Sequence, residues 1–193
     1  MKTINLIFSL FICLNLYAKT GSITGLDIPR FVSLKSNDVN LRVGPSINYP
    51  IIIKYIKQNY PIKIIEEYKD WRQVIDINNN NGWVHKSLIK GERNGIIASK
   101  KKSNLKIYNT QDGKIVGEIT PGSLISLDKC RIDWCLISDN SNHHHKGWIE
   151  KENIWGVDKN ETFNLSFFQT FYDYFFKSIN LINAKISNYS KKS

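Results

Sequence analysis

The residues in this chain that could bind a metal are two cysteines and a run of histidines. Cys130 and Cys135 lie five positions apart, and His143 to His145 begin eight residues after the second cysteine. Thiolate and imidazole are the ligands that zinc prefers, so a zinc site is one interpretation. In the internal repeat of the chain, however, the histidines take the place of Asn78 to Asn81, at a hairpin tip that accepts any polar residue. We therefore predict no metal site and no cofactor.

A second possibility is catalysis by these cysteines or by paired carboxylates. A Cys nucleophile needs a His base that a third polar group orients, and an acid and base pair needs two carboxylates across a substrate. The carboxylates that pair in sequence are Glu66 with Glu67 and Glu150 with Glu152. The cysteines lie inside a short β repeat, and no other part of the chain is long enough to form a separate catalytic domain. Charges that alternate along small sheets are typical of a solvated face. We therefore expect no enzyme activity.

The elements that position these residues are organised around one strand. From Val39 to Val43 apolar and polar residues alternate, which is the pattern of a strand with one buried face, and Gly44-Pro45 then forms a turn. Trp71 lies 30 residues after Leu41, and Trp134 lies 29 residues after Leu105. A Gly-Trp pair follows each tryptophan, at Gly82-Trp83 and Gly147-Trp148. The recurrence predicts two copies of one unit, with the tryptophans in its core.

Short β-branched runs separated by turn signals predict an all-β fold, with a small barrel or sandwich in each of the two repeats. We divide the chain into a lead-in at 19–30, repeat 1 at 31–93 and repeat 2 at 94–158. Lys86 to Ile89 is predicted as a single helical turn whose Leu88 closes one end of the first barrel. Gly95 to Ala98 is expected to be the last strand of repeat 1 or a strand that bridges the repeats.

The two ends of the chain differ from these repeats. Residues 1–18 combine Lys2, an apolar run and Ala18, which predicts a signal peptide and export to the periplasm or cell envelope. The tail at 159–193 is predicted as an amphipathic helix, since five apolar residues recur at offsets of 3, 4, 4 and 3: Phe168, Phe171, Phe175, Ile179 and Ile182. We leave open whether this helix packs on the barrels or contacts a membrane surface or a partner through residues 163–183.

The formal net charge of +10 suits anionic partners such as phospholipid or an acidic polymer. An exported protein has little access to nucleic acid, so we predict no nucleic-acid partner.

Four segments in repeat 1 resemble the bacterial-type SH3 domain, in particular the exported tandem-SH3 proteins of alphaproteobacteria: Leu41-Arg42-Val43-Gly44-Pro45-Ser46, Tyr49-Pro50, Asp70-Trp71-Arg72 and Gly82-Trp83-Val84-His85. Repeat 2 departs from the pattern, because Tyr108-Asn109-Thr110 stands where Gly44-Pro45-Ser46 stood. The resemblance implies two tandem small SH3-like barrels, and a groove that binds a peptide or the peptidoglycan stem. Aromatic and polar side chains beside such a groove supply affinity, and we select Asn40, Arg42, Tyr49 and Tyr60 as candidates.

The two cysteines also favour a disulfide. Cys130 and Cys135 flank a four-residue turn between two predicted strands, so their Cα atoms can approach within the roughly 4.4–6.8 Å that a disulfide needs. An even cysteine count in an exported chain points the same way. Similar exported members of the family carry a comparable Cys-Trp-Cys arrangement, and the resemblance therefore implies the same bridge.

Together these features predict a non-catalytic binding or scaffold protein of the cell envelope. One alternative is a membrane-surface interaction protein held by its basic charge and aromatic tail. Another is an accessory module of a cell-wall hydrolase.

Overall fold

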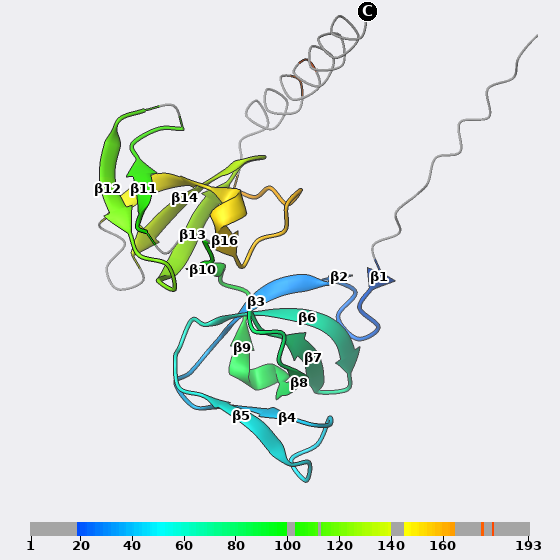
Figure 1. Ribbon diagram of the computed structural model, residues 1–193. Helices are drawn as coiled ribbons and strands as arrows, with labels where there is room; N and C mark the ends of the chain where they lie inside the picture. The colour runs from blue at the N-terminus through cyan, green and yellow to red at the C-terminus, as the bar shows by residue number, and fades with distance from the viewer. Residues whose placement is uncertain are drawn as a thin grey trace, which may run out of the picture.

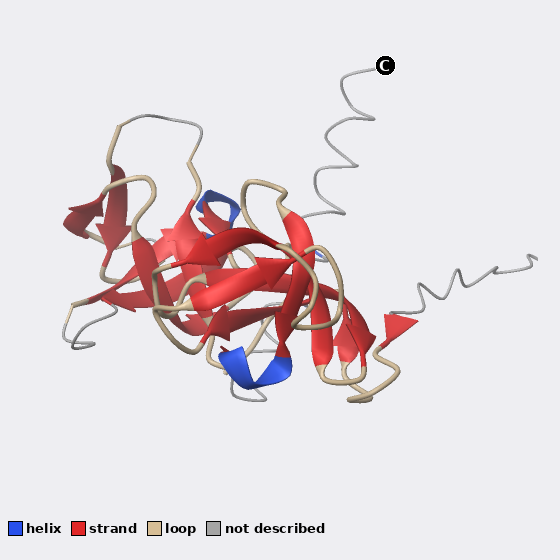
Figure 2. Ribbon diagram, turned by 90° about the horizontal axis from the view of Figure 1, so that it is seen from below, coloured by secondary structure: helices blue, strands red, loops and turns tan. Residues whose placement is uncertain are grey.

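The computed structural model describes residues 19–99, 103–111, 113–139 and 145–164, together with Phe175 and Ile179. Over these residues the protein is almost entirely β, and its only helical segments between Lys19 and Asn164 are the single 3-10 turns η1 (Lys86–Leu88) and η2 (Lys151–Asn153) (Figure 2). None of the helices among the described residues is long and apolar enough to cross a bilayer. The predicted signal peptide and nearly all of the predicted tail helix lie outside the described residues.

The strands form two seven-stranded sheets and a small N-terminal hairpin (Figure 1). The hairpin contains β1 (Lys19–Thr20) and β2 (Asp27–Ile28). The first sheet contains β3 (Arg30–Leu34), β4 (Val39–Arg42), β5 (Ile51–Tyr55), β6 (Pro61–Tyr68), β7 (Trp71–Ile75), β8 (Asn81–His85) and β9 (Ile89–Lys90). The second contains β10 (Asn94–Ile97), β11 (Leu105–Tyr108), β12 (Ile115–Ile119), β13 (Leu124–Cys130), β14 (Trp134–Asp139), β15 (Lys146–Glu150) and β16 (Ile154–Trp155).

Both sheets have the same topology, which explains the internal repeat. The first sheet runs in the order β5-β4-β8-β7-β6-β3-β9 and the second in the order β12-β11-β15-β14-β13-β10-β16. Each strand of repeat 1 therefore has one counterpart in repeat 2, and η1 and η2 occupy equivalent places. The predicted helical turn at Lys86 is confirmed, and Leu88 packs against the core of the first sheet.

Two expectations about these sheets are wrong. Strand β10 neither ends repeat 1 nor bridges the two sheets but begins repeat 2, because it pairs with β13 and β16 of the second sheet as β3 pairs with β6 and β9 of the first. The sheets also do not close into barrels. Among the described residues β5 pairs only with β4 and β9 only with β3, so the two end strands of the first sheet remain unjoined.

Each sheet has its own apolar core. The first core is built from side chains that alternate along the strands, including Leu34, Leu41, Ile64, Val74 and Val84, all fully buried. The core of the second sheet contains the disulfide between Cys130 and Cys135, whose Cα atoms lie 4.1 Å apart. The predicted bridge is therefore confirmed in the structure. Both cysteines are fully buried, so the bridge is also part of the packed interior.

Removing the disulfide is expected to destabilise the second repeat modestly. The closed loop is short, so the bridge restricts the unfolded chain by only about 2 kcal/mol. We expect the double variant Cys130→Ala and Cys135→Ala to lower the free energy of unfolding by about this amount, as measured by urea denaturation. The chain purified without residues 1–18 should contain no free thiol. Labelling of either cysteine in unreduced, denatured protein contradicts this expectation.

The N-terminal hairpin is anchored to the first sheet by Glu67 of β6. Its side chain is completely buried, although it lies between the exposed residues Glu66 and Tyr68. Its carboxylate accepts hydrogen bonds from the backbone N–H groups of Ile23 and Thr24 at 3.0 and 2.9 Å, and from the Thr24 hydroxyl at 2.7 Å. The 19–30 segment is therefore a docked part of the first repeat.

Two guanidinium groups complete the surroundings of this carboxylate. Arg30 donates to Glu67 at 2.9 Å, and Nε of the buried Arg72 lies 3.5 Å from the same oxygen. Burial acts to raise the pKa of Glu67, but the hydrogen bonds from Thr24, Arg30 and Ile23 outweigh it and lower the pKa to about 2. Glu67 is therefore ionised in the folded protein, and its charge is matched by its neighbours.

The two repeats share an interface with a buried polar chain at its centre. The Asn94 amide of β10 donates to the Ser33 hydroxyl of β3 at 2.9 Å and accepts from the Ser126 hydroxyl of β13 at 3.3 Å. All three side chains belong to buried residues. Beside this chain the rings of Phe31 and Trp155 meet edge to face at 5.0 Å. The repeats therefore pack on one another directly.

The chain remains packed on the second repeat beyond residue 158. Phe163 forms an isolated β-bridge with Cys130, and Arg93 is paired with Glu161 while its guanidinium lies over the Phe163 ring at 5.0 Å. Lys63 of the first repeat pairs with Asp158 at 2.5 Å. Residues 158–164 therefore bind the second repeat and also contact the first.

Candidate functional site

The tryptophans of the repeat motif lie on the outer face of each sheet. In β7 and β8 the buried residues Arg72, Val74 and Val84 alternate with the half-buried Trp71 and Trp83. Val74 and Val84 belong to the first core, and neither tryptophan does. The expectation that the tryptophans form the core is therefore wrong. Successive side chains point to opposite faces of a strand, and the valines take the inward positions.

The outer face of β6, β7 and β8 carries four aromatic rings in two contacting pairs, which we call the aromatic face: Tyr68, Trp71, Trp83 and His85. Tyr68 meets Trp83 edge to face with ring centroids 6.4 Å apart, and Trp71 meets His85 in the same way at 5.3 Å. Trp71 pairs in register with both Tyr68 and His85 across the ladders. These rings are held by strands, so they form a firm apolar surface that is partly open to solvent.

The glycine of each Gly-Trp pair has a steric reason. A Cβ atom at Gly82 would lie 2.6 Å from the carbonyl oxygen of Arg42 and 2.8 Å from the Leu41 side chain. At Gly147 it would lie 2.1 Å from the Ile107 side chain. Strands β8 and β15 thus cross β4 and β11 too closely for any side chain at this position. The glycine permits this crossing and sets the position of the tryptophan that follows it.

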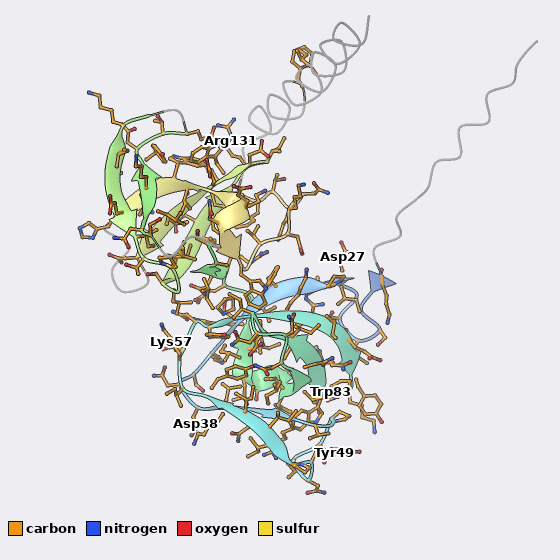
Figure 3. The ribbon with its side chains drawn as sticks, viewed as in Figure 1. Asp27, Asp38, Tyr49, Lys57, Trp83 and Arg131 are labelled. Carbon is orange, nitrogen blue, oxygen red and sulfur yellow. A yellow bond between two sulfur atoms is a disulfide. The ribbon has the colours of Figure 1, made fainter. Side chains whose placement is uncertain are left out.

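Two of the predicted ligand residues lie at the edge of the aromatic face. Arg42 is the register partner of Trp83, and its guanidinium donates to the Tyr49 carbonyl at 2.7 Å. The Tyr49 ring lies against Gly44, where an added Cβ would come within 2.7 Å of ring carbons. Figure 3 shows Tyr49 at the end of the first repeat that lies away from the second, and Trp83 nearer to the middle of the repeat. The fold therefore brings Arg42, Tyr49 and Trp83 into one region.

The other two predicted ligand residues, Tyr60 and Asn40, have different surroundings. Tyr60 packs against the first core with its ring 5.4 Å from Tyr55, and burial together with the Asp76 carboxylate raises its pKa. Asn40 lies on β4 opposite Lys54, and its buried Oδ1 accepts no hydrogen bond from the described residues. Tyr60 is therefore held by the first core, whereas Asn40 lies two residues before Arg42 on the same strand.

Charged groups surround the aromatic face. The Lys69 ammonium lies over the Tyr68 ring at 5.4 Å, and Lys86 pairs with Asp70 at 2.7 Å. The hydrogen bond from Lys86 lowers the pKa of the exposed Asp70 carboxyl. With Arg42 on the opposite side, cations border the rings on more than one edge. The surface can therefore pack against apolar groups and attract a carboxylate.

The equivalent surface of repeat 2 has different chemistry. Tyr108 and Trp134 meet edge to face at 5.6 Å, and Tyr108 is the register partner of Trp148. Tyr108 therefore takes the place of Arg42. The sequence alone matches Tyr108 with Gly44, which lies two positions further along the chain. A shift of two residues leaves every side chain on the same face of the strand, so the two repeats still match in their pattern of apolar residues. Glu150 takes the place of His85, because each pairs with the first residue of its neighbouring strand.

The residues considered for chemistry are dispersed. Glu67 holds the N-terminal hairpin, Glu66 is exposed, and Glu150 and Glu152 line a cavity of about 620 Å³ beside Trp134. The sulfur atoms of both cysteines are joined to one another. His145 pairs with Asp139 at 3.2 Å, whereas His143 and His144 lie outside the described residues. Over the described ranges no cluster of three or more acidic, His or Cys side chains could hold a metal.

A known protein family matches both copies of the repeat at the level of sequence. A family model described as bacterial SH3 domain matches residues 35–91 and 101–156. No curated protein matches the chain.

Three solved structures are similar at low identity. NlpC2 and NlpC1 from Trichomonas vaginalis match at 12% and 13% identity, and the matches cover 67% and 70% of this chain and 50% and 48% of theirs. An NlpC/P60 family protein from Bacillus cereus matches at 11% identity, over 65% of this chain and 55% of its own. The chain thus spans about half the length of these proteins. Each match has a TM-score of 0.28.

The two matched ranges together exceed half of the 193 residues, and each contains six of the seven strands of one sheet, all except β3 in the first and β10 in the second. The chain therefore belongs to the bacterial SH3 domain family and carries two copies of the domain.

Proposed function

We propose that this chain is a non-catalytic protein of the cell envelope, and that its first repeat binds a peptide or the peptide stem of peptidoglycan. The observation that carries the proposal is the aromatic face with Arg42 and Tyr49 at its edge. Peptide-binding domains use partly exposed aromatic side chains because these bury a large area at low cost in conformational entropy. A row of rings held by three strands offers such a surface to an extended chain.

The charges around the rings favour a ligand that carries carboxylates. Arg42 and Lys69 lie close to the aromatic face, and neither has a carboxylate partner among the salt bridges of the described residues. Guanidinium and ammonium groups bind carboxylates through charge-assisted hydrogen bonds. A short peptide with acidic groups or a free carboxyl end fits this arrangement, and the stem peptide of peptidoglycan belongs to this chemical class.

Two features support an exported, non-catalytic role. A disulfide is typical of proteins that fold in an oxidising compartment. The same disulfide joins Cys130 and Cys135, which are the only cysteines beyond residue 18. No free thiol therefore remains in the described part of the chain to act as a nucleophile. A binding role needs none of the acid, base or nucleophile groups that catalysis requires.

Binding to purified sacculi tests this function. We expect the full chain to sediment with sacculi and Tyr68→Ala to weaken this binding about tenfold, since an aromatic contact is typical of binding hot spots. Tyr68 is 48% exposed, so the variant should remain folded. The matched control is Ile115→Ala, which truncates a similarly exposed side chain of repeat 2. Equal loss in both variants, or no binding by the unaltered chain, contradicts the proposal. Release of soluble fragments from the sacculi contradicts its non-catalytic part.

A further inference from the structure

The second repeat contains a cavity beside Trp134 that the proposed function does not use. Its volume is about 620 Å³, within the roughly 300–1,000 Å³ of small-ligand sites. Three buried apolar residues, Ile132, Ile154 and Val157, contribute to its lining. Trp134 is half-buried in its wall, and an edge-to-face contact with Tyr108 at 5.6 Å holds the Trp134 ring. The cavity therefore offers an apolar lining and one aromatic wall.

Three carboxylates share this cavity with the apolar groups: Asp133, Glu150 and Glu152. All three residues are exposed, and none forms an ion pair within the described part of the chain. Two lysines, Lys151 and Lys159, also line the cavity, so carboxylates outnumber cations there by three to two. Among the described residues no three acidic, His or Cys side chains could hold a metal ion. The carboxylates are therefore spread around the cavity and suit an extended organic cation.

The lysine that neutralises the equivalent aspartate of repeat 1 is turned inward in repeat 2. The backbone N–H of Lys86 donates to the Asp70 carbonyl at 2.7 Å. That of Lys151 donates to the Asp133 carbonyl at 2.8 Å, so the two pairs are equivalent. The Lys86 ammonium also pairs with the Asp70 carboxylate at 2.7 Å, whereas the Lys151 ammonium is buried and donates to the Glu161 carbonyl at 2.7 Å. The segment after residue 158 thus withdraws this cation from Asp133.

The other two carboxylates are also specific to repeat 2. Glu150 takes the place of His85 in the strand pairing. Glu152 takes the place of Ser87, since each is the second residue of its 3-10 turn. The two repeats share one topology. The acidic cavity therefore does not follow from the fold, and it gives the second repeat a preference for charge opposite to that of the first.

We propose that this cavity binds a primary ammonium group carried on an apolar stem, as in a lysine side chain or a free diamine. The ammonium lies close to the face of Trp134 and donates charge-assisted hydrogen bonds to the carboxylates around it. The stem packs against the buried apolar residues, as long amphipathic side chains do on apolar surfaces. The site lies in the second repeat, so the proposal does not rest on the binding of a wall peptide by the first.

A nuclear magnetic resonance titration of the full chain tests the proposal. The probe is Nα-acetyl-lysine amide, and the control probe is the same compound acetylated at Nε, which keeps the stem and loses the charge. We expect the indole N–H signal of Trp134, identified by its absence in Trp134→Phe, to shift with the charged probe and to stay in place with the neutral one. A shift of equal size with both probes, or no shift with either, overturns the proposal.

Variants of the carboxylates separate the cavity from net charge. We expect Glu150→Gln with Glu152→Gln to bind the charged probe about tenfold more weakly, because it removes two charges from the cavity and keeps the volume of both side chains. The matched control, Glu66→Gln with Glu118→Gln, removes the same charge from two exposed residues outside the cavity and should bind as the unaltered chain does. Equal weakening in both double variants, or unchanged binding by the cavity variant, overturns the proposal.

A further probe identifies the source of the amine. The diamine cadaverine carries the ammonium and the methylene stem without peptide groups. Higher affinity for the blocked lysine supports a peptide amine as the ligand of this cavity, and higher affinity for cadaverine supports a free polyamine.

The outcome is independent of the proposed function. Tyr68→Ala, which tests the first repeat, should bind the charged probe as the unaltered chain does. Failure of the unaltered chain to bind sacculi rejects the wall ligand without affecting the ammonium site.

Discussion

Glu67→Ala is expected to lower the free energy of unfolding by about 3–5 kcal/mol, because it removes one partner of a buried ionic cluster. The Glu67 carboxylate accepts hydrogen bonds from Ile23, Thr24 and Arg30 and lies beside Arg72. Without it two guanidinium groups lose their counterion, and the N-terminal hairpin loses its anchor. Urea denaturation followed by tryptophan fluorescence measures the effect.

The neighbouring residue provides a matched control. Glu66 carries the same carboxylate one position earlier in β6, but its side chain points to solvent. We expect Glu66→Ala to change the free energy of unfolding by less than about 0.5 kcal/mol. A similar loss of unfolding free energy in the two variants would show that the buried cluster contributes little to stability.

The same carboxylate makes stability depend on acid pH. Its pKa falls from an ordinary value of 4.5 to about 2 in the folded protein, and this shift corresponds to about 3 kcal/mol. A depressed pKa stabilises the folded state fully above about pH 4.5, and the contribution disappears as the pH falls toward 2. Glu67→Gln should therefore flatten the fall of stability with acid in this range. An unchanged pH profile in the variant assigns the acid sensitivity to other groups.

Trp83→Ala is expected to leave the first repeat folded while abolishing most of its ligand binding. Trp83 is half-buried on the outer face, where it contacts Tyr68 and pairs with Arg42. Truncation of a partly exposed side chain outside the core costs about 1 kcal/mol, whereas the loss of a central aromatic residue can weaken binding by 2 kcal/mol or more, which is about thirtyfold. Thermal unfolding and sedimentation with sacculi measure the two effects separately.

Repeat 2 supplies the control for this variant. Trp148 occupies the equivalent place, but its register partner is Tyr108 and the nearby charge is Glu150. We expect Trp148→Ala to have a similar effect on stability and little effect on sacculus binding. A loss of about 3–5 kcal/mol in Trp83→Ala would return this residue to the core.

The parts of the fold that the sequence predicts are those with local signals. Short β-branched runs, turn residues and the recurring Gly-Trp pair identify two similar units, and the shared topology of the two sheets agrees with them. Alternation along β8 also predicts the face on which Trp83 lies, because the neighbouring Val84 is buried and points to the opposite face. The prediction that Trp83 lies in the core was wrong because it followed the size of the side chain and not the alternation along the strand.

Other features depend on contacts between distant residues and have no local signature. Glu67 reaches residues 43 and 44 positions earlier in the chain, and Arg93 is paired with Glu161 at a separation of 68. Nothing in a window around Glu67 distinguishes it from the exposed Glu66. The register of β11 relative to β4 could not be predicted either, because a shift of two residues preserves the alternation by which the two repeats are matched in the sequence.

The buried chain from Ser33 through Asn94 to Ser126 has a consequence for polymeric ligands. Because it joins the two sheets directly, the outer faces of the repeats are held at a spacing that the fold determines, with no flexible linker to adjust it. A ligand that engages both repeats gains avidity only when its own repeating units match this spacing, since the effective concentration of the second site falls to nearly zero when the geometry cannot be spanned. If both repeats bind one polymer, this interface would make the distance between the polymer's binding groups a determinant of affinity, in addition to their chemistry.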